Sequence, residues 1–486
     1  MTAADLMISA AGVEIFIFVA GCAVLCADLF LPKEYRAQLH WSVIAALLVA
    51  AAATAGTFAD APVSALRGFF VSGPLAAILK TTTLLAVAGS LAFSRGYLHS
   101  GGMLRGEFHA LALFAALGML VMISAGHFLS LYLGLELMSL SLYAMIAMRR
   151  GDARAAEAAI KYFVLGALAS GLFLYGVSVI YGATGGGLYF SEVAAVAASG
   201  GAASGAALSL GLVFALAGLA FKLGAAPFHM WLPDVYEGAP APMTLFVAAA
   251  PKVAAMAMML RVLADALPSM HSEWRDMLIL LSLASLAVGN ITAIAQTDIK
   301  RMLAYSAIAH SGFMLLGVLA GGVDGLAAAV FYVVAYALMT VGGFGIVVLM
   351  APDGRENGAL DSLKGLASRN GLVAGVLAAL MLSMAGVPPV VGFAAKLTVL
   401  QAVAGAGLVW LAAVAVLFSA VGAFYYLRVI KLMFFDPPDE DAAAMRLSPA
   451  ASGLVALVGV LILGLGVFPG ALLSACEAAA KIAVSS

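Results

Sequence analysis

One carboxylate, four lysines and two histidines lie in stretches of this sequence that are otherwise apolar. They are Glu136, Lys161, Lys222, His229, Lys252, His310 and Lys396. An ionisable side chain in hydrocarbon is costly, so it usually faces the interior of a helix bundle or a water-filled cavity and marks an ion pathway. Burial beside other charges also brings amines and carboxyls into the range where they load and release protons. The set therefore predicts proton transfer.

Lys222 occupies the most unusual setting of the seven. It follows an apolar run over residues 208–221, and Pro227 removes a backbone donor shortly after it. A broken helix at membrane depth is tolerated only where protein or water satisfies the freed carbonyls. A charge beside such a break is typical of a transport site.

Glu136 lies among apolar neighbours on both sides. A buried carboxylate keeps its charge mainly where an opposite charge is near, so Lys161 and Lys222 are its candidate partners. The alternative is a static ion pair that fixes the packing of two helices, although such pairs are weak evidence for stability.

Two histidines and a lysine would extend the path. His229, Lys252 and His310 would continue a hydrated line toward Lys396, and histidine suits such a role because it titrates near neutral pH. Taken alone, His310 is more typical of a core histidine with satisfied hydrogen bonds than of a proton carrier.

Three further charges lie near the predicted edges of the membrane. We expect Lys80 to snorkel, because a long side chain near a helix end can carry its amine to the interface. Asp234 and Glu237 follow the Lys222 segment at a predicted cytoplasmic exit. A solvated loop and a proton funnel both fit these two carboxylates.

The composition indicates what must position these groups. Hydrophobic residues make up 64% of the chain and charged residues 10%, whereas a soluble domain is about 25% charged. The net charge of -1 gives no sign of a nucleic-acid partner. The spacing of Cys22, Cys26 and Cys476 fits neither an iron–sulfur cluster nor a zinc site. The N-terminus shows neither a signal peptide nor a transit peptide.

A membrane span needs about 20 apolar residues, and we count fourteen such segments. They run approximately over residues 6–30, 40–58, 71–93, 108–126, 128–148, 156–181, 209–230, 243–264, 276–296, 302–321, 325–350, 371–405, 407–433 and 452–475. The predicted fold class is an all-α polytopic membrane protein.

Basic residues give the expected orientation. The loops after odd-numbered segments hold most of the basic side chains, among them Lys33, Arg36, Arg149 and Arg150. The even loops and the C-terminal tail hold only Arg67, Arg261, Arg275 and Lys481. By the positive-inside rule the odd loops are cytoplasmic and both termini lie outside.

An internal repeat divides the chain. A shift of 174 residues carries segments 4–8 onto segments 9–13, Lys222 onto Lys396 and Glu136 onto His310. Because five is odd, the second unit would be inverted, as in many secondary transporters. Chance similarity between two hydrophobic regions is the alternative. We expect N-terminal helices over 1–107, five-helix repeats with broken helices 7 and 12 over 108–265 and 276–435, and a final helix in 436–486.

Six stretches resemble the antiporter-like subunits of respiratory complex I, the proton-pumping NADH:quinone oxidoreductase. They are HFLSLYLGLELMSLSLYAM from His127, IKYFVLGALASG from Ile160, FKLGAAPFHMWLPDVYEGAP from Phe221, PKVAAM around Lys252, KRMLAYSAIAHSGF from Lys300 and GVPPVVGFAAKLTVL from Gly386. The resemblance spans nearly the whole chain. It is strongest to the subunit called N, because position 396 is lysine rather than the glutamate of subunit M, and because no long lateral helix like that of subunit L follows the last span.

The resemblance implies roles for the residues. Glu136 and Lys222 would form the central protonatable pair, with Lys161 modulating it. His229 and Lys252 would link onward, and Lys396 would stand at the outer side of the relay. FMN, the iron–sulfur clusters and quinone would be bound by partner subunits and no cofactor by this chain. Its neighbours would resemble subunits M and K, in the bilayer of a bacterial plasma membrane with both termini periplasmic.

Other functions share part of this pattern. An Mrp-like Na+/H+ antiporter subunit would use the same glutamate and lysine, and complex I subunit M is a further alternative. A third possibility is an assembly scaffold with a vestigial channel.

Overall fold

The computed structural model describes residues 3–30, 32, 35–58, 62–149, 151–200, 202–351, 353–438 and 444–485. Within them, 13 helices are long and apolar enough to cross a membrane. The predicted segment 371–405 is a further pair of shorter apolar helices, α15 (Gly371–Ala385) and α16 (Val391–Gly405). Together they account for the fourteen predicted segments, which confirms the all-α polytopic class.

The N-terminal part has three long helices and a small hairpin. These are α1 (Ala3–Phe30), α2 (Arg36–Ala55), α3 (Pro74–Ser100), and the antiparallel strands β1 (Val63–Ala65) and β2 (Phe70–Ser72). The hairpin was not predicted, and α3 continues past the predicted end at residue 93. Lys33 and Arg150, two of the basic loop residues, lie outside the described residues.

The next two groups of helices have the same order. The first has α4 (Gly106–Ser124), α5 (Phe128–Ile146), α6 (Ala153–Ala183), the interrupted pair α8 (Ala202–Leu223) and α9 (Trp231–Gly238), and α10 (Ala241–Leu260). The second has α11 (His271–Ile294), α12 (Ile299–Ala320), α13 (Gly322–Leu349), the interrupted pair α15 and α16, and α17 (Val409–Phe434). In both groups the fourth helix is the broken one. The short helices α7 (Phe190–Ser199) and α14 (Leu366–Arg369) lie in connections.

Glycine allows the first two helices of each group to cross closely. A Cβ on Gly118 of α4 would lie 2.5 Å from the backbone nitrogen of Met138 on α5. A Cβ on Gly289 of α11 would lie 2.5 Å from that of Ala309 on α12. Small residues permit such backbone contact between membrane helices, so the two groups share a packing feature as well as an order.

The last predicted segment, 452–475, is two helices rather than one. α18 (Pro449–Val467) ends before Pro469, and α19 (Gly470–Ser485) begins after it. Proline cannot donate to the preceding turn and restricts the residue before it, so the helix stops there. α19 packs on α13 and α3.

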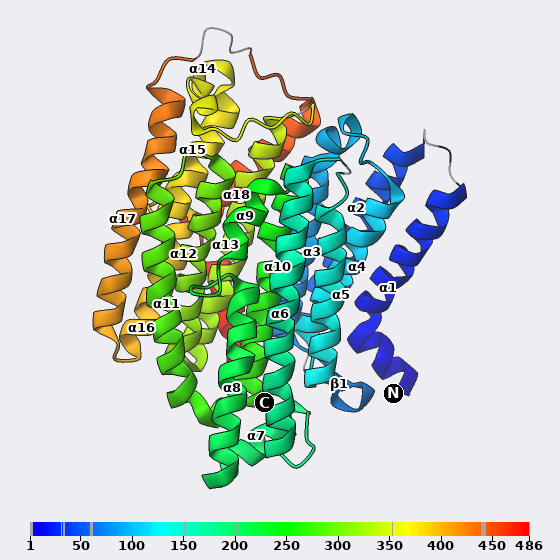
Figure 1. The fold of residues 1–486 in the computed structure, drawn as a ribbon, viewed down its shortest axis with the longest axis vertical. Helices are drawn as coiled ribbons and strands as arrows, with labels where there is room; N and C mark the ends of the chain where they lie inside the picture. Colours follow the sequence, from blue (N-terminus) through cyan, green and yellow to red (C-terminus); the bar gives the residue numbers. More distant parts are fainter. Residues whose placement is uncertain are drawn as a thin grey trace.

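The central helices are α10, α12 and α13, which Figure 1 shows surrounded by the others. In the apolar stretch of α10 all residues are buried, and in that of α12 94% of them are. In the apolar stretch of α18, at the edge of the bundle, 22% are buried. A helix that is apolar on all sides is suited to such a position. Polar side chains on α10 and α12 therefore lie in the middle of the bundle. The N and C marks lie in the lower half of Figure 1, on the side of α7 and β1, and α14 lies at the opposite end.

The prediction that Lys80 snorkels is wrong. Lys80 is 3% exposed, and its Nζ lies 2.7 Å from the Oε1 atom of Glu14 on α1. The amine also lies 5.4 Å above the ring of Phe70 in β2. The hairpin and α1 cover this part of α3, so the lysine has a buried carboxylate within reach instead of the interface.

Candidate functional site

The break after α8 is an ordered turn whose backbone groups are bonded by side chains. Three such hydrogen bonds are Trp231 Nε1 to the carbonyl of Phe221 at 3.0 Å, Ser311 Oγ to the carbonyl of Leu223 at 2.8 Å, and the amide of Ala226 to Ser285 Oγ at 2.9 Å. A helix can be interrupted at membrane depth when neighbours satisfy its freed groups in this way. The sequence predicted the break, and α12 and α11 supply two of the partners.

Lys222 lies in the last turn of α8 and donates to Ser139 Oγ on α5 at 2.9 Å. Glu136 lies three residues before Ser139 on the same helix, and it accepts a hydrogen bond of 2.5 Å from Ser170 on α6. In the part of the chain that the structure describes, no ion pair joins Glu136 to a lysine. Lys222 is within electrostatic range of Glu136, so Ser139 stands between two charges that attract each other without touching.

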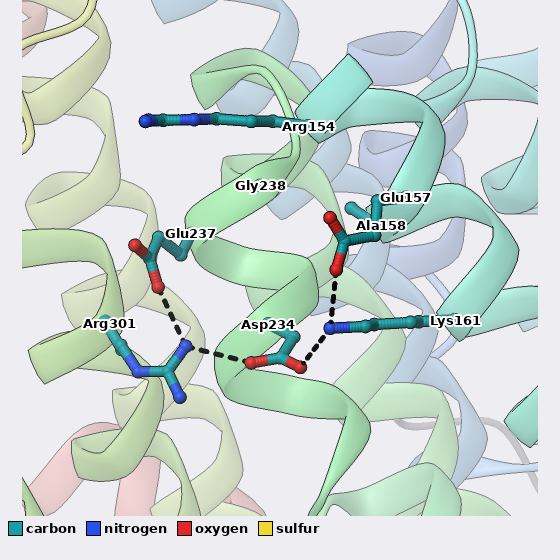
Figure 2. A pocket seen from close by; sticks show the side chains of 8 residues that line it. All are labelled: Arg154, Glu157, Ala158, Lys161, Asp234, Glu237, Gly238 and Arg301. Atoms are coloured by element: carbon teal, nitrogen blue, oxygen red, sulfur yellow. Dashed lines mark hydrogen bonds and ion pairs between the residues drawn. The ribbon is translucent and has the colours of Figure 1, made fainter.

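Lys161 lies in a different cluster, shown in Figure 2. Its Nζ lies 2.8 Å from Glu157, one turn earlier on α6, and 2.7 Å from Asp234 on α9. Arg301 of α12 bonds Asp234 at 2.9 Å and Glu237 at 2.8 Å. The Lys161 side chain is 41% exposed, so it is not the buried partner of Glu136 that the sequence suggested.

This cluster surrounds a charged cavity of about 300 Å³. The cavity is lined by Arg154, Glu157, Ala158, Lys161, Asp234, Glu237, Gly238 and Arg301. Asp234 and Glu237, for which a solvated loop and a proton funnel both remained open, are thus held in ion pairs beside a cavity. The charged groups also fasten the short helix α9 to α6 and α12.

A second network at the same end of the bundle centres on Glu356. Its Oε2 accepts from the buried Lys300 at 2.5 Å, and its Oε1 accepts from Tyr97 at 2.5 Å and from the first amide of α10, at Ala241, at 2.8 Å. Lys300 also donates to the carbonyl of Ala239 at 2.8 Å. A carboxylate at a helix N-terminus satisfies an unpaired amide and the positive end of the dipole. Glu356 thereby ties the loop before α14 to three helices.

Replacing Glu356 by alanine is expected to lower the amount of assembled protein. The ammonium of Lys300 would stay buried without its carboxylate, and breaking a buried pair costs on the order of 3 kcal/mol or more. Native gel electrophoresis of solubilised membranes and the thermal midpoint of the purified protein measure the effect. Asp353→Ala, an exposed acid of the same loop, is the control. Wild-type yield and midpoint in Glu356→Ala would contradict the prediction.

Lys252 of α10 is bound by α12. Its Nζ donates to the carbonyl of Ala307 at 2.8 Å and to Ser311 Oγ at 2.9 Å, and lies 5.3 Å above the ring of Tyr336. Because Ser311 also donates to Leu223, one hydroxyl connects Lys252 to the end of α8. Hydrogen bonds therefore run from Lys252 to the backbone beside Lys222, while the Lys222 ammonium itself bonds Ser139.

His310 lies one residue before Ser311 and has partners at both ring nitrogens. Nδ1 lies 2.7 Å from the hydroxyl of Tyr332, and Nε2 lies 3.3 Å from that of Tyr426. The ring is within electrostatic range of both Lys252 and Lys396. His310 is thus a satisfied core histidine that also stands between two lysines, so both sequence interpretations describe part of its setting.

Lys396 lies on α16, and its side chain reaches back across the break between α15 and α16. Its Nζ donates to the carbonyl of Ala385, the last residue of α15, at 2.9 Å and to Ser419 Oγ on α17 at 2.8 Å. It also lies 5.0 Å above the ring of Phe313, one turn after His310 on α12. Lys396 therefore contacts the break between α15 and α16 directly.

Gly386 makes room for that lysine. Its φ is +88°, and a Cβ on it would lie 2.7 Å from Cδ of Lys396. Gly386→Ala is expected to destabilise the protein by about 1–2 kcal/mol for the left-handed conformation alone, with displacement of Lys396 in addition. Thermal unfolding of the purified protein and pumping per assembled complex report the two effects. Gly375→Ala, in open space on α15, should be neutral, and equal results for the two variants would contradict the prediction.

His229 lies in the turn between α8 and α9 and is half-buried. Among the described residues, its buried Nδ1 has no hydrogen-bond partner, and no contact joins it to Lys222 or Lys252. Of the seven predicted groups, the structure thus places Glu136, Lys222, Lys252, His310 and Lys396 along one line, with Lys161 and His229 outside it. The exposed fractions of Lys222, Lys252, His310 and Lys396 are 7%, 2%, 3% and 8%.

The sequence interpretation missed the hydroxyl groups that bond these side chains. They are Ser139, Ser170, Ser311, Ser419, Tyr332 and Tyr426. The available signal was weak: Ser139 is one turn from Glu136, and Ser311 adjoins His310.

Comparison with known proteins agrees with this geometry. Residues 125–422 match the family described as NADH:quinone oxidoreductase/Mrp antiporter, TM. The chain is 53% identical over 463 residues to NADH-quinone oxidoreductase subunit N of Thiobacillus denitrificans, covering 95% of each chain. It is 50% identical over 456 residues to the protein of the same name from Nitrosomonas europaea, covering 94% of each.

Solved structures show the same fold. A chain of respiratory complex I from Thermus thermophilus with bound aureothin superposes with a TM-score of 0.82 at 35% identity, covering 96% of this chain and 100% of that one. A chain of the Mrp complex from Dietzia sp. DQ12-45-1b gives a TM-score of 0.85 at 23% identity, covering 97% and 96%, which is evidence of a shared fold alone. Identity over the full length therefore decides between the two families. The chain belongs to the NADH-quinone oxidoreductase subunit N family, the antiporter-like membrane-arm subunits of respiratory complex I.

Proposed function

We propose that this chain carries protons along the line Glu136, Lys222, Lys252, His310 and Lys396, driven by quinone reduction in other subunits of the complex. One observation supports this most directly. Ser311 accepts from Lys252 and donates to the last carbonyl of α8, next to Lys222. Buried ionisable groups in membrane proteins mark ion paths by default, and here each of the five groups has a hydroxyl partner, two of them at the helix breaks.

Each group in the line has a role that suits its surroundings. Glu136 and Lys222 attract each other across Ser139, so a proton gained by one changes the proton affinity of the other. His310 offers a ring that can accept and donate between Lys252 and Lys396. Lys161, with Asp234 and Arg301, belongs to the cavity at the end we predict to be cytoplasmic, where it would influence proton uptake rather than pair with Glu136. His229 would act at the edge of the break between α8 and α9.

We also propose the surroundings of the chain, with its relatives and its charge distribution as support. FMN, the iron–sulfur clusters and quinone would be held by partner subunits. The membrane-arm neighbours would resemble subunits M and K. By the positive-inside rule the odd-loop side would face the cytoplasm of a bacterium and both termini the periplasm. The two repeats would cover residues 108–265 and 276–435.

Glu136→Gln in the intact complex tests the proposal. The complex is purified, reconstituted in vesicles, and assayed for proton pumping and for NADH-driven quinone reduction. We expect normal assembly, with both activities lowered at least about tenfold, since an amide neither holds nor releases a proton in this range. Glu273→Gln, an exposed acid at the start of α11, is the control. Full pumping by assembled Glu136→Gln would overturn the proposal.

The same material separates the alternatives. Sodium-dependent proton exchange by the isolated chain would favour an antiporter. Loss of assembly in Glu136→Gln, with normal pumping by the remaining complex, would favour a scaffold.

A further inference from the structure

Ser311 lies where three groups meet. The residue is fully buried on α12, and its hydroxyl oxygen accepts from Lys252 Nζ at 2.9 Å. The same hydroxyl is placed to donate to the carbonyl of Leu223 at 2.8 Å or to that of Ala307, one turn earlier, at 2.9 Å. A serine hydroxyl has one hydrogen to donate, so it cannot serve both carbonyls fully at once.

The carbonyl of Leu223 is a special acceptor. Leu223 is the last residue of α8, and the final carbonyls of a helix have no partner within it and carry the negative end of the helix dipole. Lys222 is its neighbour in the chain. A change in the hydrogen bonding of this carbonyl therefore changes the electrostatic potential at Lys222.

The second broken helix also has a serine beside its lysine. Lys396 donates to Ser419 Oγ at 2.8 Å, and Ser419 lies 3.2 Å from the carbonyl of Ala385, the last residue of α15. In both breaks a serine hydroxyl contacts a lysine ammonium and the last carbonyl of the first half-helix, and in the second break Lys396 also donates to that carbonyl directly, at 2.9 Å. The serines come from α12 and α17, which are not matching helices of the repeat. Two separate occurrences indicate a shared role.

We propose that Ser311 is a positioning residue that transmits the protonation state of Lys252 to the end of α8, beside Lys222. This inference rests on the proposed function, because it requires Lys252 to gain and lose a proton. As an ammonium, Lys252 donates to Ser311, whose hydrogen is then directed to a backbone carbonyl. As a neutral amine it has a lone pair, and Ser311 can turn its hydrogen toward Nζ.

The rotation has a direct consequence for Lys222. When the hydroxyl turns to a neutral Lys252, the carbonyl of Leu223 loses its donor, and the end of α8 attracts positive charge more strongly. Departure of the proton from Lys252 to the next acceptor in the line thus favours a charged Lys222. No covalent bond to Ser311 forms or breaks. The two lysines are thus coupled, so that loss of a proton from Lys252 favours binding of a proton at Lys222.

Ser311→Ala in the intact, reconstituted complex tests this inference. Alanine removes a hydrogen bond to a charged group, so we expect pumping per assembled complex to fall about tenfold or more. Ser311→Thr keeps a hydroxyl and should recover most of the activity. Ser282→Ala is the matched control, because the Ser282 hydroxyl is buried on the adjacent α11 with no partner in the described chain.

A double-variant cycle distinguishes positioning from simple packing. If Ser311 acts through Lys252, then Lys252→Met with Ser311→Ala should pump no worse than Lys252→Met alone. Normal pumping by Ser311→Ala, or a loss confined to assembly, would overturn the inference while the relay itself stands. Normal pumping by Lys252→Met would instead overturn the proposed function.

Discussion

Lys222→Arg and Lys222→Ala are both expected to lower proton pumping by the assembled complex more than tenfold. Alanine removes the group that joins Ser139 to the end of α8. Arginine keeps a positive charge but is not deprotonated in proteins, so it would hold a proton without releasing it. Pumping and coupled quinone reduction in reconstituted vesicles measure the loss.

The arginine variant decides between a relay and a static charge. If Lys222 only supplied a fixed positive charge near Glu136, Lys222→Arg would retain activity and Lys222→Ala would lose it. If Lys222 must release its proton, both fail. Lys481→Ala, at an exposed lysine of α19, should match the wild type. Activity in Lys222→Arg close to that of the wild type would therefore exclude proton release at this position.

Much of the scaffold could be predicted from the sequence because hydropathy and helix-breaking residues act locally. Thirteen of the fourteen apolar segments contain a long helix of the described chain, and Gly386 with the two prolines that follow it separates the shorter helices α15 and α16. Pro469 divides the last segment in the same way. Treating this proline as a helix break would have predicted α18 and α19 as separate helices. Boundaries differ mainly where the hairpin and connecting helices add structure outside the membrane segments.

The partners of the charges could not be predicted because they depend on how distant helices pack. Lys161 meets Asp234 and Lys80 meets Glu14, each across more than sixty residues of sequence. The contact of Lys161 with Glu157, one turn earlier on α6, does follow from helical spacing. A buried lysine pairs with the carboxylate or hydroxyl that the fold brings near it. The sequence shows the possible partners but not which of them lies within reach.

The bridging serines were hidden for a related reason. Serine is common in membrane helices, where its hydroxyl can bond the carbonyl one turn earlier. Ser90 bonds Ala86 and Ser141 bonds Leu137 in this way, at 2.7 Å each. Ser311 makes the same local bond to Ala307. Only the arrival of Lys252 and Leu223 from other helices distinguishes it, which is a property of the fold and not of the local sequence.

Lys80→Met is expected to destabilise the protein by about 3–5 kcal/mol, because it leaves the Glu14 carboxylate buried without its partner. The double variant Glu14→Gln with Lys80→Met should recover most of that loss, since removing both charges also removes the cost of burying them. Thermal midpoints and assembled yield measure both. Lys364→Ala breaks a mostly exposed pair with Asp361 and should change stability by no more than about 1 kcal/mol.

The double variant also tests whether this pair belongs to the proton path. Glu14 and Lys80 join α1 to α3, apart from the line between Lys222 and Lys396. We therefore expect normal pumping per assembled complex once the stability is recovered. A double variant as unstable as Lys80→Met would contradict the ion-pair argument. A stable double variant that cannot pump would show that a buried carboxylate and lysine outside the two repeats also carry protons, and that the line through the helix breaks is not the whole path.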